Sequence, residues 1–286
     1  MSVMTQAPRY HTRMQRPLLA KARRWTPAPL VGGIIAARTR RGLADPAMLD
    51  RGRREMRFVL GDDAPDAEVE AAARRYVEQW FARAELRWRP RMMLMPVRGI
   101  DRLKDAQALG RGVLLNFSHH GHYEAAIGSV GLAGVPQVSI NDTKYLRDDC
   151  PDTRRQNLVL SEIGGNRLEF TDIGYAGILG LVQSGEVVTM ASDVAGTTPV
   201  RFLGRDLLGS SGAARIAHTA GAPVVVMTTR RDDRGKRYVQ LGDPLNPSYF
   251  ASVEDLLAEM LAQHEDAVRA WPEAYDSPLS RWGTPE

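Results

Sequence analysis

The chain has a single cysteine, Cys150, among its 286 residues. One thiol cannot form an internal disulfide, so the sequence favours a reducing compartment such as the cytoplasm. Long apolar runs are also missing. The best candidate, Ala28 to Ala37, is far shorter than the roughly 20 residues that a membrane-spanning helix needs, and it contains Gly32 and Gly33. We therefore expect no transmembrane helix and, without an apolar h-region near the start, no signal peptide.

The sequence motifs of several enzyme classes are absent as well. The chain has no P-loop, no glycine fingerprint for a dinucleotide, and no G-x-S-x-G elbow of the serine hydrolases. It also lacks the paired cysteines of common metal sites. These absences predict a protein without a bound metal or cofactor, and they argue against Ser118 as a catalytic nucleophile.

The remaining composition is that of a globular protein, with 43% hydrophobic and 25% charged residues. Apolar runs and amphipathic segments alternate along the chain, and Asp66 is the expected N-cap of a helix that continues to Pro90. Alternating strands and helices predict an α/β fold, with a mostly parallel central sheet flanked by helices on both faces. We place one such domain at residues 61–286. The expected strands cover residues 113–117, 135–140, 167–170, 186–191, 200–203, 224–228 and 238–241.

The first 60 residues differ from the rest in charge. They hold thirteen Lys and Arg residues against three acids, and prolines at 17, 27, 29 and 46 divide them into two or three short helices. Apolar side chains such as Trp25 and Leu30 are interleaved. This mixture suits an anionic membrane surface, and we expect a peripheral protein on the cytoplasmic face of the cell membrane. A solvated basic arm is the alternative, whereas no nucleic-acid motif accompanies the charge.

Three of the six histidines lie in the segment 116–124, directly after the expected strand Val113 to Phe117. Histidine is suited to accept a proton near neutral pH, and a carboxylate on its other ring nitrogen fixes the tautomer. On one helix His119 and Glu124 would lie about 140° apart and would not meet. They can meet if His119 is on the loop and Glu124 is in the first helical turn. A zinc site or a polar loop without chemistry remains an alternative.

The segment Gly112 to Glu124 resembles the H-x4-D/E block of the bacterial lipid acyltransferase family. That family includes the lauroyl and myristoyl transferases of lipid A synthesis and the phosphatidylinositol mannoside acyltransferases. His119, Gly121 and Glu124 match its catalytic histidine, glycine and acidic residue, and the sequence departs from the pattern at His120 and His122. The resemblance covers about residues 97–271. Its second block is carried by residues 185–193, 199–204, 212–215 and 221–225.

The resemblance implies transfer of a fatty acyl chain from an acyl thioester, acyl-CoA or acyl-carrier protein, to a hydroxyl of a lipid or glycolipid. His119 would be the general base and Glu124 its partner. Asp193 matches an acid of the family pattern and would bind a headgroup or orient a basic neighbour. Separately from the resemblance, a group of basic residues could bind phosphates of the donor or acceptor, or else be ordinary surface charges. Two alternatives remain, namely a non-catalytic lipid-binding protein on the same scaffold and a condensation-type acyltransferase acting on a secondary metabolite. The basic candidates are Lys144, Arg147, Arg154 and Arg201.

Overall fold

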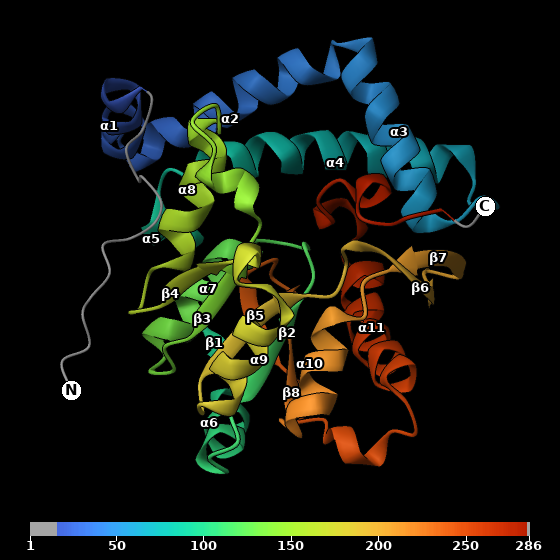
Figure 1. Cartoon of the computed structure of the whole chain (residues 1–286). Coiled ribbons are helices and arrows are strands. Elements are labelled where there is room, and N and C mark those ends of the chain that lie inside the picture. Colours follow the sequence, from blue (N-terminus) through green and yellow to red (C-terminus); the bar gives the residue numbers. More distant parts are fainter. Residues whose placement is uncertain (1–15, 285–286) are drawn as a thin grey trace.

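The computed structural model describes residues 16–284 and shows a seven-stranded sheet covered by helices (Figure 1). The strand order is β1-β9-β8-β2-β5-β3-β4, and every neighbouring pair is parallel except β8 and β9. The predicted mostly parallel α/β fold is therefore confirmed. The strands are β1 (Val97–Arg98), β2 (Val113–Phe117), β3 (Val138–Asn141), β4 (Arg167–Phe170), β5 (Val187–Ala191), β8 (Val224–Arg231) and β9 (Arg237–Leu241).

Helices pack on both faces of this sheet because its central strands carry buried, mostly apolar side chains on both faces. All five residues of β2 are buried. Leu114 belongs to the larger core on one face, while Val113 and Leu115 belong to the core on the other, as the alternation of side chains along a strand requires. The helices of the main domain are α4 (Asp66–Leu86), α5 (Pro90–Met93), α6 (Ile100–Ala108), α7 (Tyr123–Leu132), α8 (Asp152–Ser161), α9 (Gly174–Gln183), α10 (Gly212–Ala220) and α11 (Val253–Ala270).

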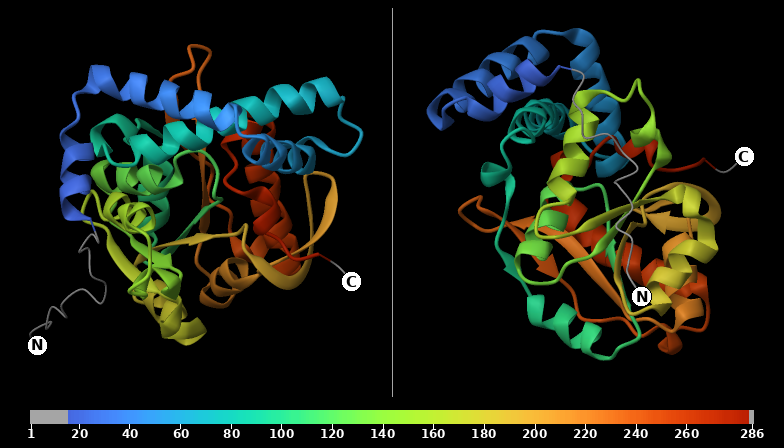
Figure 2. Two further views of the ribbon diagram at one scale, coloured as in Figure 1. Left: turned by 90° about the horizontal axis from the view of Figure 1, so that it is seen from above. Right: turned by 60° about the vertical axis from the view of Figure 1, so that its left-hand side comes forward.

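Three further helices, α1 (Pro17–Trp25), α2 (Ala28–Leu43) and α3 (Pro46–Leu60), precede this domain. The helices α2 and α3 lie over α4, whereas α1 lies near its carboxyl end (Figures 1 and 2). Their prolines open the helices, because the first turn needs no N–H partner at that position. Met56 and Val59 of α3 pack in the same core as Val69 and Tyr76 of α4. The basic region thus shares its core with the rest of the protein, and its Arg9 and Arg13 lie outside the described residues.

Other local predictions need correction. Asp66 is the first residue of α4 and Pro65 occupies the cap position, so Asp66 places its charge in the first turn without a capping bond. The single strand expected at residues 200–203 is one arm of a hairpin, β6 (Ala195–Phe202) with β7 (Arg205–Gly209), set apart from the main sheet. Among residues 16–284, no helix combines the length and apolar character that crossing a bilayer requires.

The C-terminal tail is held against the rest of the molecule. After α11 it forms the short 3-10 turns η4 (Pro272–Ala274) and η5 (Pro278–Ser280). It then bridges the β6–β7 hairpin through two backbone hydrogen bonds between Gly283 and Leu208. In Figure 1 this red segment lies between α4 and the sheet. The tail consequently reaches the edge of the sheet where the carboxyl ends of β2 and β5 meet.

Candidate active site

Two neighbouring strands bring His119 and Asp193 together. In the parallel pair of β2 and β5, Phe117 lies opposite Ala191, the last residue of each strand. His119 and Asp193 each follow two residues later, so they leave the sheet at the same edge and at the same height. The carboxyl edge of a parallel sheet is where α/β proteins place their ligands and catalytic groups. Strand register alone therefore accounts for the meeting of residues 74 positions apart in the sequence.

Asp193 holds His119 with both carboxylate oxygens. The His119 backbone N–H donates to Oδ2 at 2.8 Å, and ring atom Nδ1 lies 2.9 Å from Oδ1. An ionised carboxylate only accepts hydrogen bonds, so Nδ1 carries the proton in the neutral ring. The lone pair is then on Nε2. This is the tautomer that a general base requires.

The surroundings keep His119 uncharged at rest. Its ring packs edge-on against Tyr123 at 4.8 Å and lies 5.5 Å from the ring of Phe117. Burial and the positive charge of Arg281 lower the pKa of His119, and Asp193 only partly opposes them. Burial acts to raise the pKa of Asp193, but the nearby His119 and Arg281 outweigh it and hold that pKa below its usual value. A neutral imidazole beside an ionised carboxylate is therefore the resting state.

The loop that carries His119 needs a glycine. Gly121 has φ of +65°, which L side chains rarely adopt, and a Cβ there would lie 2.6 Å from Cβ of Thr229. Its N–H donates to the Ala274 carbonyl at 3.0 Å. The loop thus turns sharply between β2 and α7 while it is fastened to the C-terminal tail.

Glu124 occupies a different place from the one predicted. Its carboxylate is 1% exposed and accepts from Arg83 of α4 at 2.7 Å and from Arg87, the C-cap residue of that helix, at 3.3 Å. Burial acts to raise the pKa of Glu124, but the two guanidinium groups hold it below its usual value. The expected hydrogen bond from His119 to Glu124 is thus replaced by the one to Asp193. The reason is that Glu124, in the first turn of α7, faces α4 rather than the β2–β5 edge.

Two charged residues of the C-terminal tail, Asp276 and Arg281, were missed by sequence analysis. The Asp276 N–H donates to the His119 carbonyl at 2.9 Å, and its carboxylate pairs with Arg83 at 3.1 Å and with Arg281 at 3.3 Å. Arg281 also donates from Nε to the Asp276 carbonyl at 3.0 Å. No local pattern marks the pair, because residues five apart are not neighbours on a helix and the contacts with Arg83 and His119 join distant segments.

The neighbouring histidines serve the fold. His120 contacts the Trp271 carbonyl through Nε2 at 2.9 Å, and burial lowers its pKa to about 4. His122 accepts from the Arg237 guanidinium, and burial followed by that charge lowers its pKa well below the usual range. Both side chains are buried. The differences from the family pattern at these two positions therefore affect the packing around the loop.

The predicted basic residues are exposed on the surface. Lys144 and Arg147 follow β3 and are paired with Asp142 and Asp149 in their own loop, at 2.9 Å each. Arg201 pairs with Asp206 across the β6–β7 hairpin at 3.0 Å. The fourth of them, residue 154, is exposed in the first turn of α8. Their role in binding substrate remains a prediction.

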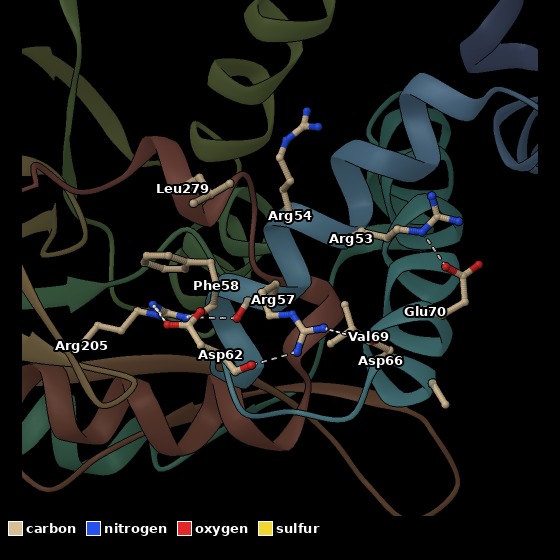
Figure 3. Close-up of a pocket in the computed structure, with 11 residues that line it drawn as sticks. Arg53, Arg54, Arg57, Phe58, Asp62, Asp66, Val69, Glu70, Arg205 and Leu279 are labelled. Carbon is tan, nitrogen blue, oxygen red and sulfur yellow. Dashed lines mark hydrogen bonds and ion pairs between the residues drawn. The ribbon is translucent and has the colours of Figure 1, made fainter.

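A cavity of about 820 Å³ is separate from this edge. It lies among α3, the start of α4, Arg205 and Leu279, and neither His119 nor Asp193 lines it (Figure 3). Most of its charges are already paired within its own walls, as in the pair of Arg205 with Asp62 at 2.6 Å. In the part of the chain that the structure describes, no group of His, Cys, Asp and Glu could hold a metal ion.

Comparison with known proteins now supplies the family. Residues 64–284, about three quarters of the chain, match the family model of the bacterial lipid A biosynthesis acyltransferases. The chain belongs to this family. It is therefore an acyltransferase of lipid biosynthesis, and the predicted family is confirmed.

One solved structure illustrates the wider similarity of this acyltransferase. The 1-acyl-sn-glycerophosphate (LPA) acyltransferase PlsC from Thermotoga maritima has 14% sequence identity and a TM-score of 0.43, over 89% of this chain and 95% of that chain. No curated protein matches the sequence. The family match supports neither the non-catalytic lipid-binding protein nor the condensation-type acyltransferase that the sequence had left open.

Proposed function

We propose that this acyltransferase moves a fatty acyl chain from an acyl thioester to a hydroxyl group of a lipid or glycolipid. The donor is acyl-CoA or acyl-carrier protein. His119 is the general base, and Asp193 is the carboxylate that orients it. The observation that carries the proposal is the bond from Nδ1 of His119 to Asp193, because it leaves Nε2 as the proton acceptor.

The reaction is a direct transfer. Nε2 of His119 takes the acceptor's hydroxyl proton while that oxygen attacks the thioester carbonyl carbon. The tetrahedral oxyanion then collapses, the C–S bond breaks, and the leaving thiolate takes the proton from Nε2. Formation of imidazolium turns the His119–Asp193 hydrogen bond into an ion pair, which stabilises the charge that develops during attack.

Neither Cys150 nor Ser118 is a suitable nucleophile for an acyl-enzyme intermediate. Cys150 is the sole thiol of the chain, and burial raises its pKa, which disfavours the reactive thiolate. Its sulfur lies 3.9 Å from the Pro151 carbonyl in the loop before α8. Ser118 precedes the base directly, and neighbouring side chains on extended backbone point to opposite sides. Donor and acceptor therefore bind together before the chemical step.

Glu124 acts in this proposal as a positioning residue. It fixes Arg83, and Arg83 in turn pairs with Asp276, whose N–H holds the His119 carbonyl. The acidic position of the H-x4-E motif thus supports the loop of the base instead of contacting the base. The proposed substrate sites are the exposed residues at or near the same edge, Lys144, Arg147, Arg154 and Arg201, which suit phosphate groups of donor or acceptor.

His119→Ala tests the function. Acyl transfer should fall by roughly 10²–10⁴-fold, the usual contribution of a general base. The protein should stay folded but lose some thermal stability, because the buried carboxylate of Asp193 loses its ring partner. His218→Ala, at an exposed position of α10, is the matched control. The measurement is transfer of a labelled acyl chain from acyl-CoA, and from acyl-carrier protein, to a lipid extract. Wild-type activity in His119→Ala would exclude His119 as the base.

The N-terminal helices are the proposed attachment to the membrane, which would make the enzyme peripheral on the cytoplasmic face. Leu18, Trp25 and Leu30 are 81%, 83% and 59% exposed on α1 and α2. Exposed Lys21, Arg24, Arg40 and Arg41 lie on the same two helices. Apolar side chains that enter the interface beside cations that contact anionic headgroups fit this composition. The two helices lie above the sheet, on the side of the molecule where α4 covers the His119 edge (Figure 1).

Vesicle sedimentation tests this attachment in the full-length protein, since deleting residues 1–60 would uncover the core side chains of α3. At about 1 kcal/mol per basic residue near an anionic surface, replacing Arg24, Arg40 and Arg41 by Gln should weaken binding to phosphatidylserine-containing vesicles roughly hundredfold. Trp25→Ala should weaken the apolar part of vesicle binding, which high salt does not screen. Arg269→Gln on α11 is the control. Unchanged binding by the triple variant would place the membrane surface elsewhere.

A further inference from the structure

The C-terminal tail forms one wall of the catalytic loop. Three backbone contacts join them in sequence: the Trp271 carbonyl to the His120 ring, the Ala274 carbonyl to the Gly121 N–H, and the Asp276 N–H to the His119 carbonyl. His120 and Tyr275 form an isolated antiparallel bridge at the same place. The loop that carries the base thus contacts the tail at each of residues 119, 120 and 121.

Asp276 and Arg281 fix the tail at this point through a buried chain of charges. The chain runs from Glu124 to Arg83, from Arg83 to Asp276, and from Asp276 to Arg281, with contacts of 2.7, 3.1 and 3.3 Å. Arg281 is 19% exposed and holds Asp276 twice, at the carboxylate and at the carbonyl. A guanidinium that makes two bonds to one residue fixes its geometry in a way that lysine cannot.

We propose that Arg281 is a positioning residue for the general base, because it fixes Asp276 and, through Asp276, the His119 loop. The proposal rests on the function proposed above for His119. Arg281, which follows the turn η5, would then affect the rate of transfer without contacting substrate. Asp276 is the intermediary, because its N–H holds the His119 carbonyl.

Charges around His119 come from every element that packs on it. Asp193 follows β5, Tyr123 belongs to α7, and Asp276 with Arg281 belongs to the tail. Arg83 of α4 stacks on Tyr123 at 4.7 Å and reaches Asp276. The carboxylates of Asp193, Asp276 and Glu124 are balanced by the three guanidinium groups at positions 83, 87 and 281. Loss of Arg281 would leave an excess of negative charge, which favours a protonated His119.

Two substitutions with opposite effects test the proposal, read from the dependence of kcat/KM on pH. Arg281→Gln should lower kcat by roughly 10- to 100-fold through misplacement of the base. It should also move the acidic limb to higher pH, because His119 then stays protonated further into the neutral range. Asp276→Asn removes a negative charge and should move that limb to lower pH. A merely structural role would lower the rate and the thermal stability of both variants without moving the limb.

Two controls separate charge from geometry. Arg281→Lys keeps the charge but cannot make both bonds to Asp276, so it should keep the wild-type limb while lowering kcat. Arg269→Gln, an exposed arginine paired with Glu265 on α11, should change neither. An unmoved acidic limb in both Arg281→Gln and Asp276→Asn would overturn the proposal.

A second readout does not depend on turnover. The ring resonances of His119, assigned by their loss in His119→Ala, can be titrated by NMR in wild type and in Arg281→Gln. The titration midpoint should move to higher pH in the variant even if the transfer reaction itself proves to be different. An unchanged midpoint would refute the role of Arg281, whereas a shifted midpoint in a protein that transfers no acyl group would refute only the proposed function.

Discussion

Asp193 and Glu124 are the two buried carboxylates beside the His119 loop, and they bind opposite kinds of partner. Asp193 holds a neutral imidazole and a backbone N–H. Glu124 holds the guanidinium groups of Arg83 and Arg87. An ion pair with arginine is complete at rest and stays so throughout a reaction cycle. A hydrogen bond to neutral histidine can still gain strength when the ring takes a proton.

This difference divides the work between the two acids. Only interactions that become stronger in the transition state raise the chemical rate, and among these two carboxylates Asp193 alone contacts a group whose charge changes. Glu124 keeps Arg83 in place, and through it the tail that supports the loop. One acid therefore takes part in the proton transfer, and the other holds the framework in which the transfer occurs.

Asp193→Asn should produce the largest loss of activity. The asparagine amide can donate to Nδ1 and favour the wrong tautomer, so kcat should fall on the order of 10³–10⁴-fold while the fold remains. Asp243→Asn, at an exposed position in an ion pair with Arg102, is the control. The measurement is initial rate of acyl transfer at saturating donor and acceptor. A loss below tenfold would mean that Asp193 does not orient the base.

Glu124→Gln should reduce stability more than chemistry. Removing one partner of a buried ion pair leaves Arg83 and Arg87 partly uncompensated, at a cost of about 3–5 kcal/mol in the free energy of unfolding. The rate should fall less than in Asp193→Asn, because the base keeps its own carboxylate. Urea unfolding and transfer assays on Glu124→Gln, compared with Glu78→Gln at an exposed site of α4, measure both. A variant as stable as wild type but inactive would reverse the assigned roles.

Between pH 6.5 and about 4, the free energy of unfolding should depend on the buried histidines and not on Asp193 and Glu124. His120 and His264 have pKa values lowered by burial from 6.5 to about 4. Below pH 6.5 the unfolded chain binds protons that the folded protein does not, so stability falls as pH falls from 6.5 to about 4. Each histidine contributes roughly 1 kcal/mol per pH unit to this slope. The pKa values of Asp193 and Glu124 are lowered, so their contacts persist in this window.

The slope is measured by denaturant unfolding at several pH values. His264→Gln should make the slope shallower, because one of the buried rings no longer titrates. A slope that is the same with and without His264 would contradict its neutral, buried state.

Much of this site follows from short-range sequence patterns. The apolar run of β2 is confirmed residue for residue from Val113 to Phe117, and the loop position of His119 and the helix after it follow from the run and from Gly121. Ser252 caps α11, with its hydroxyl accepting from the Asp255 N–H at 3.0 Å, a pairing that the serine and the acid three residues later indicate in the sequence. These features depend on a few neighbouring residues, so a single sequence contains the information.

The partner of His119 depends instead on strand order. Asp193 is beside His119 because β5 pairs with β2 although β3 and β4 lie between them in the chain. Nothing local in the sequence specifies that crossover. Spacing made Glu124 the obvious carboxylate, but the direction of a side chain in the first turn of α7 depends on how α7 packs against α4. The tail contacts of Asp276 were hidden for the same reason, since they join segments more than 150 residues apart.

The tautomer of His119 tests the central claim most directly. Nitrogen-15 NMR of the histidine rings, with His119 assigned from the His119→Ala variant, reports which ring nitrogen carries the proton near neutral pH. We predict the Nδ1–H form in the wild-type protein and in Glu124→Gln, and its loss in Asp193→Asn. If Glu124→Gln changed the tautomer and Asp193→Asn left it unchanged, Glu124 would be the partner of the base and the account would be contradicted.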